Sequence, residues 1–172
     1  MSQLTALSVS IGILGAIATW LYLTVGGILI WAGFIAWACF FHCGGDTNAL
    51  KNTIANNIWG CICAWAAALL ILGVPMADKL GLPVWAGICV GLLALVLCLG
   101  ANIKAISVIP AGVYGFAASF AFLLQTPEML SMANLTSLSL KNSLIVVPLS
   151  MIIGAIFGFV SGKVAGMLTK AA

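Results

Sequence analysis

The chain has 172 residues, of which 64% are hydrophobic and only 5% are charged, and its formal net charge is +3. Soluble domains carry roughly 25% charged residues, so this composition excludes an ordinary soluble protein and indicates an integral membrane protein. The 6 basic residues are all lysines, spread singly along the chain, and this excludes a nucleic-acid-binding patch.

In chain order, the sequence predicts six membrane spans, at residues 8–23, 27–43, 50–73, 83–100, 107–124 and 142–168. A hydrocarbon core about 30 Å thick needs about 20 apolar residues per span, and no charged residue occurs before Asp46. We expect Gly26 and Gly27 to form the first turn, and the polar connection 125–141 to lie at a membrane surface. Because open strands cannot span lipid, the expected fold is an all-α membrane protein with 1–172 as a single transmembrane domain.

Two segments recur in the same order along the chain. Residues 32–41 read AGFIAWACFF and residues 111–120 read AGVYGFAASF, which matches Trp37 with Phe116, and the LKN of residues 50–52 recurs at 140–142. Because each half has an odd number of spans, the second half enters the membrane from the opposite face. We therefore predict two inverted three-helix repeats, about residues 4–74 and about 82–170, an architecture typical of transporters with a site near the midplane.

Asn52 and Asn56 are the leading candidate site residues. If the third helix begins near residue 50, Asn56 lies about 9 Å along it, where an unpaired amide in hydrocarbon is costly. The helical face that carries these asparagines also carries Trp59, Gly60 and Cys63. Either this stripe lines a water-accessible path for a small polar solute, or Asn56 makes an interhelical hydrogen bond. For Asn57, which points about 100° away, the interhelical bond is favoured.

His42 shares one predicted helical face with Cys39 and Cys43. Because histidine titrates near neutral pH, His42 is a candidate proton-sensitive gate or pore-mouth residue, and an interfacial histidine without such a role is the alternative. The three side chains could also hold a soft metal, but no fourth ligand is evident, and we expect no metal and no cofactor. The 6 cysteines lie in apolar surroundings and do not indicate a disulfide framework.

Aromatic residues of the second and fifth spans are the remaining candidates for pore lining. Gly44-Gly45 and Pro110 suggest that both spans are interrupted, which a membrane tolerates only where the backbone faces protein or water. The expected constricting side chains are Trp31, Trp37, Phe41, Tyr114, Phe116 and Phe120. For any one of them, packing or an interfacial belt is the alternative.

The last span carries glycines at four-residue spacing, namely Gly154, Gly158, Gly162 and Gly166. Small residues at this interval let another helix approach closely, within the chain or in a neighbouring subunit, and so thin a bundle favours a homo-oligomer. The 3 acidic residues lie in predicted loops, which argues against an enzyme and against a carrier with a buried acid. We expect a channel or facilitator for a small neutral polar solute of the size of urea, an amide or ammonia. The alternative function is a non-conducting scaffold that binds a partner through the glycine-rich helix.

The segments WAGFIAWACFFHCGGD, residues 31–46, and LKNTIANNIWG, residues 50–60, resemble the YcdZ-like bacterial inner-membrane proteins, the domain of unknown function 1097 family. The resemblance implies a bacterial inner-membrane location and about six helices, and it implies no substrate. In the predicted topology, one side carries Lys51, Lys104, Lys163 and Lys170. The other side carries only Lys79 and Lys141, so the positive-inside rule predicts cytoplasmic termini.

Overall fold

The computed structural model describes residues 1–169, and the regular secondary structure of these residues is entirely helical. The long helices are α1 (Gln3–Val25), α2 (Ile30–His42), α3 (Thr47–Gly73), α5 (Leu82–Leu99), α6 (Ile109–Gln125) and α8 (Ser143–Leu168). The short elements are α4 (Ala77–Leu80), α7 (Met132–Leu135) and the 3-10 turns η1 (Gly100–Asn102) and η2 (Lys104–Ile106). Each predicted span therefore corresponds to one long helix.

The six long helices fall into two length classes. The helix α1, the helix α3, the segment Leu82–Asn102 and the helix α8 are long and apolar enough to cross a membrane. The helices α2 and α6 have 13 and 17 residues. At a rise of 1.5 Å per residue they span about 20 and 26 Å, less than the hydrocarbon thickness of about 30 Å. The chain thus combines four full-length helices with two shorter apolar ones.

Glycines and polar caps set the helix ends. Gly26 and Gly27 have φ values of 66° and 68°, which confirms the predicted turn between the first two helices. Asp46 begins α3 by accepting a hydrogen bond from the Ala49 N–H at 2.7 Å. The predicted interruption of the second and fifth spans is wrong. Gly44 and Gly45 follow the end of α2, and Pro110 lies in the first turn of α6, where its missing N–H costs nothing.

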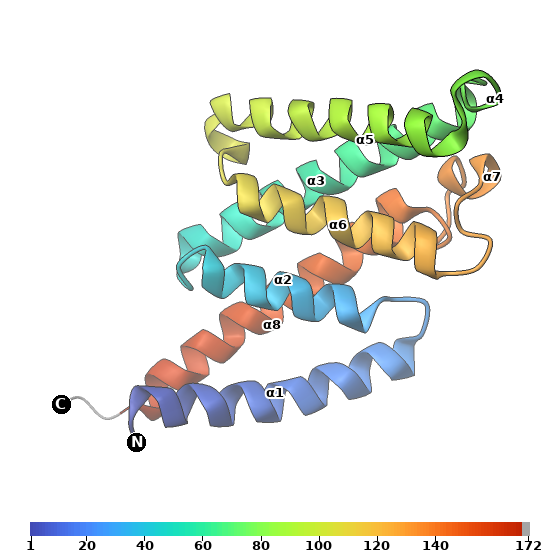
Figure 1. Cartoon of the computed structure of the whole chain (residues 1–172). Helices are drawn as coiled ribbons and strands as arrows, with labels where there is room; N and C mark the ends of the chain where they lie inside the picture. The colour runs from blue at the N-terminus through green and yellow to red at the C-terminus, as the bar shows by residue number, and fades with distance from the viewer. Residues whose placement is uncertain (170–172) are drawn as a thin grey trace.

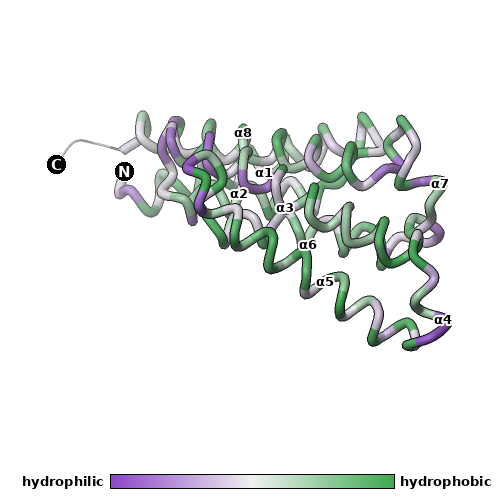
Figure 2. The backbone as a smooth tube through the Cα atoms, turned by 90° about the horizontal axis from the view of Figure 1, so that it is seen from above, coloured by the Kyte–Doolittle hydropathy of each residue, from purple (hydrophilic) through white to green (hydrophobic). Residues whose placement is uncertain are grey.

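The helices form one bundle in which α3 and α8 occupy the centre. Figure 1 shows α1, α2, α6 and α5 side by side, with α3 and α8 running diagonally behind them. The N-terminal amine hydrogen-bonds to the Leu168 carbonyl at 3.3 Å, so α1 begins beside the end of α8, and α4 and α7 lie at the opposite end of the bundle. Figure 2 shows that hydrophilic residues gather towards these two ends.

The long helix of each half packs on the short helix of the other half. The helix α3 packs mainly on α6, and α8 packs mainly on α2. Glycines allow both contacts, because a Cβ on Gly60 would overlap the Gly112 carbonyl and a Cβ on Gly154 would overlap the Gly33 carbonyl. The helices of both halves are therefore interlocked, and the glycines at the start of the α8 stripe find their partner within the chain.

Candidate functional site

The predicted asparagine pair lies at the contact between α3 and α6. Asn56 is buried, its Oδ1 accepts a hydrogen bond from the Val108 N–H at 3.0 Å, and its Nδ2 donates to the Asn52 carbonyl at 2.8 Å. On the same face, the Trp59 indole N–H donates to the Leu97 carbonyl of α5 at 3.2 Å. The bonds to Val108 and Leu97 are those of the interhelical alternative, whereas the bond to Asn52 lies within α3, and a pore-lining role for Asn52 and Asn56 stays a prediction.

The bond from Asn56 has a counterpart in the other half of the chain. Ser150 of α8 accepts a hydrogen bond from the Leu29 N–H at 2.9 Å and donates to the Val146 carbonyl at 2.7 Å. Leu29 and Val108 are the N-cap residues that precede α2 and α6, and neither offers a capping side chain of its own. Each short helix is therefore capped by a side chain from the long helix of the opposite half.

A second polar stripe of α3 faces the interior of the bundle. Thr53, Asn57 and Cys61 follow each other at four-residue spacing and are at most 1% exposed. Cys39 of α2 donates a thiol hydrogen bond to Asn57 Oδ1 at 3.6 Å, and Cys61 donates to the Gly115 carbonyl of α6 at 3.4 Å. The buried Ser119 of α6 lies beside Cys61. We call Cys39, Thr53, Asn57, Cys61 and Ser119 the polar column.

Three groups of the polar column have no hydrogen-bond partner. They are Thr53 Oγ1, Asn57 Nδ2 and Ser119 Oγ, each enclosed by protein, and the two hydroxyls lie beside the thiols of Cys39 and Cys61. Buried polar groups in folded proteins are nearly always paired, so these three groups are exceptions that distinguish the column from the rest of the core. Sequence reasoning missed this column because it followed Asn52 and Asn56. The spacing of Thr53, Asn57 and Cys61 was the signal that could have revealed it.

His42 and Tyr114 meet at the end of the bundle that carries the N-terminus. His42 Nδ1 lies 3.0 Å from the Tyr114 hydroxyl, a hydrogen bond that joins the last turn of α2 to α6. Cys39 of the polar column lies one turn before His42 on α2, and Gly115 follows Tyr114 on α6. This hydrogen bond, the His42–Tyr114 bridge, therefore lies next to the polar column. It lies towards the end of the bundle that carries the N-terminus, which we call the terminal end.

The metal-binding arrangement of Cys39, His42 and Cys43 is not assembled. Cys39 is hydrogen-bonded to Asn57 and His42 to Tyr114, so the two side chains engage different partners. Within residues 1–169, no group of three histidine, cysteine or acidic side chains is placed to hold a metal ion.

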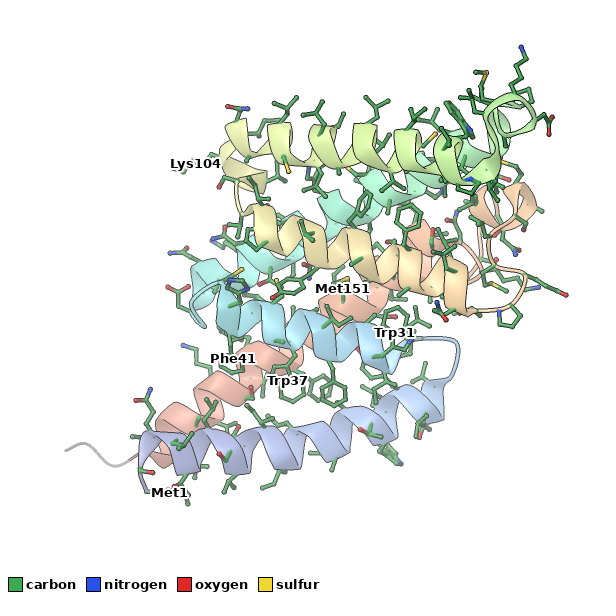
Figure 3. All side chains as sticks on the ribbon, in the orientation of Figure 1. Met1, Trp31, Trp37, Phe41, Lys104 and Met151 are labelled. Atoms are coloured by element: carbon green, nitrogen blue, oxygen red, sulfur yellow. The ribbon has the colours of Figure 1, made fainter. Side chains whose placement is uncertain are left out.

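The candidate aromatic residues lie in different parts of the bundle, and no cleft is lined by all of them. Trp37 donates its indole N–H to Ser161 Oγ of α8 at 3.0 Å and stacks on Phe34 and Phe157. Figure 3 shows Trp37 and Phe41 on α2, on the side towards α1. Phe116 and Phe120, whose rings lie 5.1 Å apart, line a different cleft. Trp31 is a partly exposed residue near the start of α2.

Two clefts lie at opposite ends of the bundle. A cleft of about 520 Å³ at the terminal end is lined by Gln3, Leu7 and Phe41 together with Gly44, Gly45 and residues near the end of α8. A cleft of about 460 Å³ at the other end is lined by Leu82, Ala86 and Phe120 among others. The first cleft has polar and apolar walls, whereas the second presents only apolar atoms. The two clefts therefore differ in chemistry.

Comparison with known proteins finds one family and one curated relative. Residues 8–166 match the family described as "Protein of unknown function (DUF1097)". The chain is 29% identical over 122 residues to "Inner membrane protein YcdZ" of Escherichia coli (strain K12), an alignment that covers 70% of this chain and 71% of the relative. No solved structure matches the chain. The match agrees with the resemblance that the sequence segments carried.

Proposed function

Because the chain belongs to the DUF1097 family, which is described as a family of unknown function, we propose a function from the site itself: a bacterial inner-membrane channel or facilitator for a small neutral polar solute. We propose no enzymatic activity and no cofactor. The name of the relative and the four helices that can span a membrane support the proposed inner-membrane location.

The polar column is the observation that carries this proposal. A purely structural membrane protein would gain nothing from three unpaired polar groups between α3 and α6, because each of them is costly in an apolar interior. The polar column contains an amide, two hydroxyls and two thiols and no charged side chain. Uncharged groups of this kind suit a neutral solute and do not suit an ion, which needs charged or multiple carbonyl partners to leave water.

We further propose that the six long helices are six spans arranged as two inverted halves. The reciprocal packing of α3 on α6 and of α8 on α2 supports this, and so do the reciprocal caps Asn56 to Val108 and Ser150 to Leu29. The caps match Asn56 with Ser150, one helical turn further along α8 than the LKN repeat suggests. Transporters built from inverted halves place their sites near the axis that relates the halves.

The proposed orientation places both termini in the cytoplasm. Lys51 near the start of α3, Lys104 in η2 and Lys163 near the end of α8 belong to the terminal end of the bundle, and Lys79 in α4 and Lys141 after α7 belong to the other end. A reporter active only outside the cytoplasm should be inactive when fused after residue 172 and active when inserted between residues 136 and 139. The reverse pattern would contradict the proposed orientation, and equal activity at both sites would contradict six spans.

A homo-oligomer is proposed through the outer face of α5. Its Gly87 and Gly91 have no atom within 4 Å of a built Cβ, and most of its large apolar side chains are exposed. Close helix packing in lipid uses small residues at this spacing. The scaffold alternative is weakened, because Gly154 and Gly158 of α8 are already covered by α2.

Solute flux in proteoliposomes tests the proposed function. Stopped-flow light scattering would compare vesicles that hold the wild-type protein with empty vesicles, in gradients of urea, acetamide, glycerol and ammonium chloride. We expect faster equilibration of urea or acetamide with the wild-type protein than with empty vesicles. Vesicles holding Met151→Leu, a change of similar volume in the same core, should behave as the wild type. Equal rates with and without protein for all four solutes would overturn the proposal.

A further inference from the structure

The cleft at the α4 end of the bundle lies between α5 and α6, and we call it the apolar cleft. The helix α5 packs mainly on α3 and has little contact with α6. Figures 1 and 2 show α5 and α6 diverging towards the end that carries α4. The space left between them measures about 460 Å³, and its walls include Leu82, Ala86 and Val90 of α5 and Phe116, Phe120 and Leu124 of α6.

The walls of the apolar cleft exclude water and polar solutes. The atoms that they present are all apolar, so a water molecule or a polar solute would lose its hydrogen bonds there. An empty cleft is also unfavourable, because its walls would lose the dispersion contacts that a close-packed neighbour provides. The chemistry of the walls therefore calls for a hydrocarbon occupant.

The apolar cleft reaches from one membrane surface to about the middle of the membrane. It runs from Leu82 to Val90 along α5 and from Phe116 to Leu124 along α6. At a rise of 1.5 Å per residue, each stretch is about 12 Å long, close to the depth of about 15 Å of one leaflet. Leu82 begins α5 and Leu124 lies in the last turn of α6, so the cleft starts at the α4 end of the bundle.

The contact between α1 and α2 shows a closed groove in the same bundle. Beside Trp37, the side chains of Tyr22 and Phe34 leave no space for a water molecule. In the repeat, Trp37 is matched by Phe116, whose smaller ring lines the apolar cleft. The chain therefore fills the groove beside Trp37 with its own side chains and leaves the apolar cleft open.

The bulk of the walls favours a flexible chain over a helix of a second copy. Helices that pack closely in lipid meet at small residues. Among the residues that line the apolar cleft, Ala86 and Ala117 are small, and the others are large aliphatic or aromatic side chains. A hydrocarbon chain has no fixed shape and can follow such walls, whereas a rigid helix cannot.

We infer that the apolar cleft binds one acyl chain of a phospholipid from the leaflet at the α4 end, which is the outer leaflet in the proposed orientation. The chain enters beside Leu82 and Leu124 and ends between Val90 and Phe116. This lipid site goes beyond the proposed solute pathway and does not depend on it, so a failure of solute flux leaves the site standing.

Photo-crosslinking in lipid nanodiscs tests this inference. The probe is a phosphatidylethanolamine with a diazirine near the end of one acyl chain, and mass spectrometry locates the labelled residues of the full-length protein. We expect labelling of Val90 at least fivefold above that of Ile13. Both residues lie near the middle of their helices, and Ile13 is 59% exposed on α1 without lining the cleft. Equal labelling of the two residues would mean that lipid only solvates the helices and would overturn the inference.

Native mass spectrometry counts the lipid that stays bound when the protein is released from detergent micelles. We expect one phosphatidylethanolamine per protomer in the wild type. Val90→Phe and Ala117→Phe place a ring in the apolar cleft and should each lower the lipid-bound fraction at least fivefold. Val84→Phe is the matched control, because Val84 is 55% exposed on the same helix and does not line the cleft. Unchanged lipid retention in Ala117→Phe would overturn the inference, even if Val90→Phe fails to fold.

The same spectra report the oligomeric state and so test a second copy as the occupant. If a second copy fills the apolar cleft, the wild type should retain no lipid there, and Val90→Phe and Ala117→Phe should dissociate the oligomer. That result would overturn the inference. With a lipid in the cleft, both variants should lose the lipid and keep the oligomeric state of the wild type.

Discussion

Asn56 of α3 holds the start of α6 in place, since its Oδ1 accepts the Val108 N–H at 3.0 Å. Ser150 of α8 does the same for α2 through the Leu29 N–H at 2.9 Å. The first N–H groups of a helix have no partner within it, and in an apolar interior they cannot turn to water. The bundle therefore depends on two side chains that act across its halves.

Removing either cap should destabilise the bundle. We expect Asn56→Ala and Ser150→Ala each to lower the free energy of unfolding by about 0.5–2 kcal/mol, as loss of a helix cap does elsewhere. Circular dichroism during unfolding in mixed detergent micelles measures this. Ser8→Ala is the matched control, because Ser8 donates only to the Leu4 carbonyl of its own exposed helix turn. An equal effect of all three changes would contradict the capping role.

The interlocking glycines should tolerate no side chain. Gly60→Ala and Gly154→Ala place a methyl group against the Gly112 and Gly33 carbonyls, so we expect a loss of about 1–3 kcal/mol or more from overpacking. Gly12→Ala is the control, because a Cβ at Gly12 meets no atom within 4 Å. It should leave stability unchanged or raise it by about 0.5–1 kcal/mol through helix propensity. The same unfolding measurement applies, and equal losses at Gly12 and Gly60 would refute the proposed packing.

The unpaired hydroxyls of the polar column should reduce stability in the ligand-free protein. Thr53→Val and Ser119→Ala remove a buried hydroxyl that has no partner, so we expect each to raise the free energy of unfolding by about 1 kcal/mol. Removing the paired hydroxyl of Ser150 should instead lower the free energy of unfolding. Destabilisation by both column changes would mean that these hydroxyls serve the fold and not a ligand.

The bridge between His42 and Tyr114 should restrain solute passage if the polar column is the pathway. Tyr114→Phe removes one hydrogen bond, worth about 1 kcal/mol, and should raise acetamide flux in proteoliposomes roughly fivefold. Tyr22→Phe is the matched control. The Tyr22 hydroxyl donates to the Ser150 carbonyl at 2.6 Å, so its loss should lower stability and leave the flux unchanged. Lower flux in Tyr114→Phe would contradict the restraining role.

Hydrophobic runs and glycines were enough to predict where the helices lie. Charged residues are so rare that the apolar segments stand out, and an apolar segment in lipid must be helical because every backbone group needs a partner. The Gly26-Gly27 turn was equally readable, since positive φ angles favour glycine. The predicted breaks at Gly44-Gly45 and Pro110 were wrong because glycine and proline also mark helix ends, and the sequence pattern does not distinguish an end from an interruption.

Only the tertiary structure decided which face of α3 packs in the core of the bundle. The stripe with Asn52 and Asn56 and the stripe with Thr53 and Asn57 lie about 100° apart on one helix, and both carry polar residues among apolar ones. The first stripe turned out to face α6, where Asn56 caps the Val108 N–H, and the second faces the core. Hydrophobic periodicity separates lipid from protein only when one face is apolar, and a helix packed on several sides by other helices has no such face.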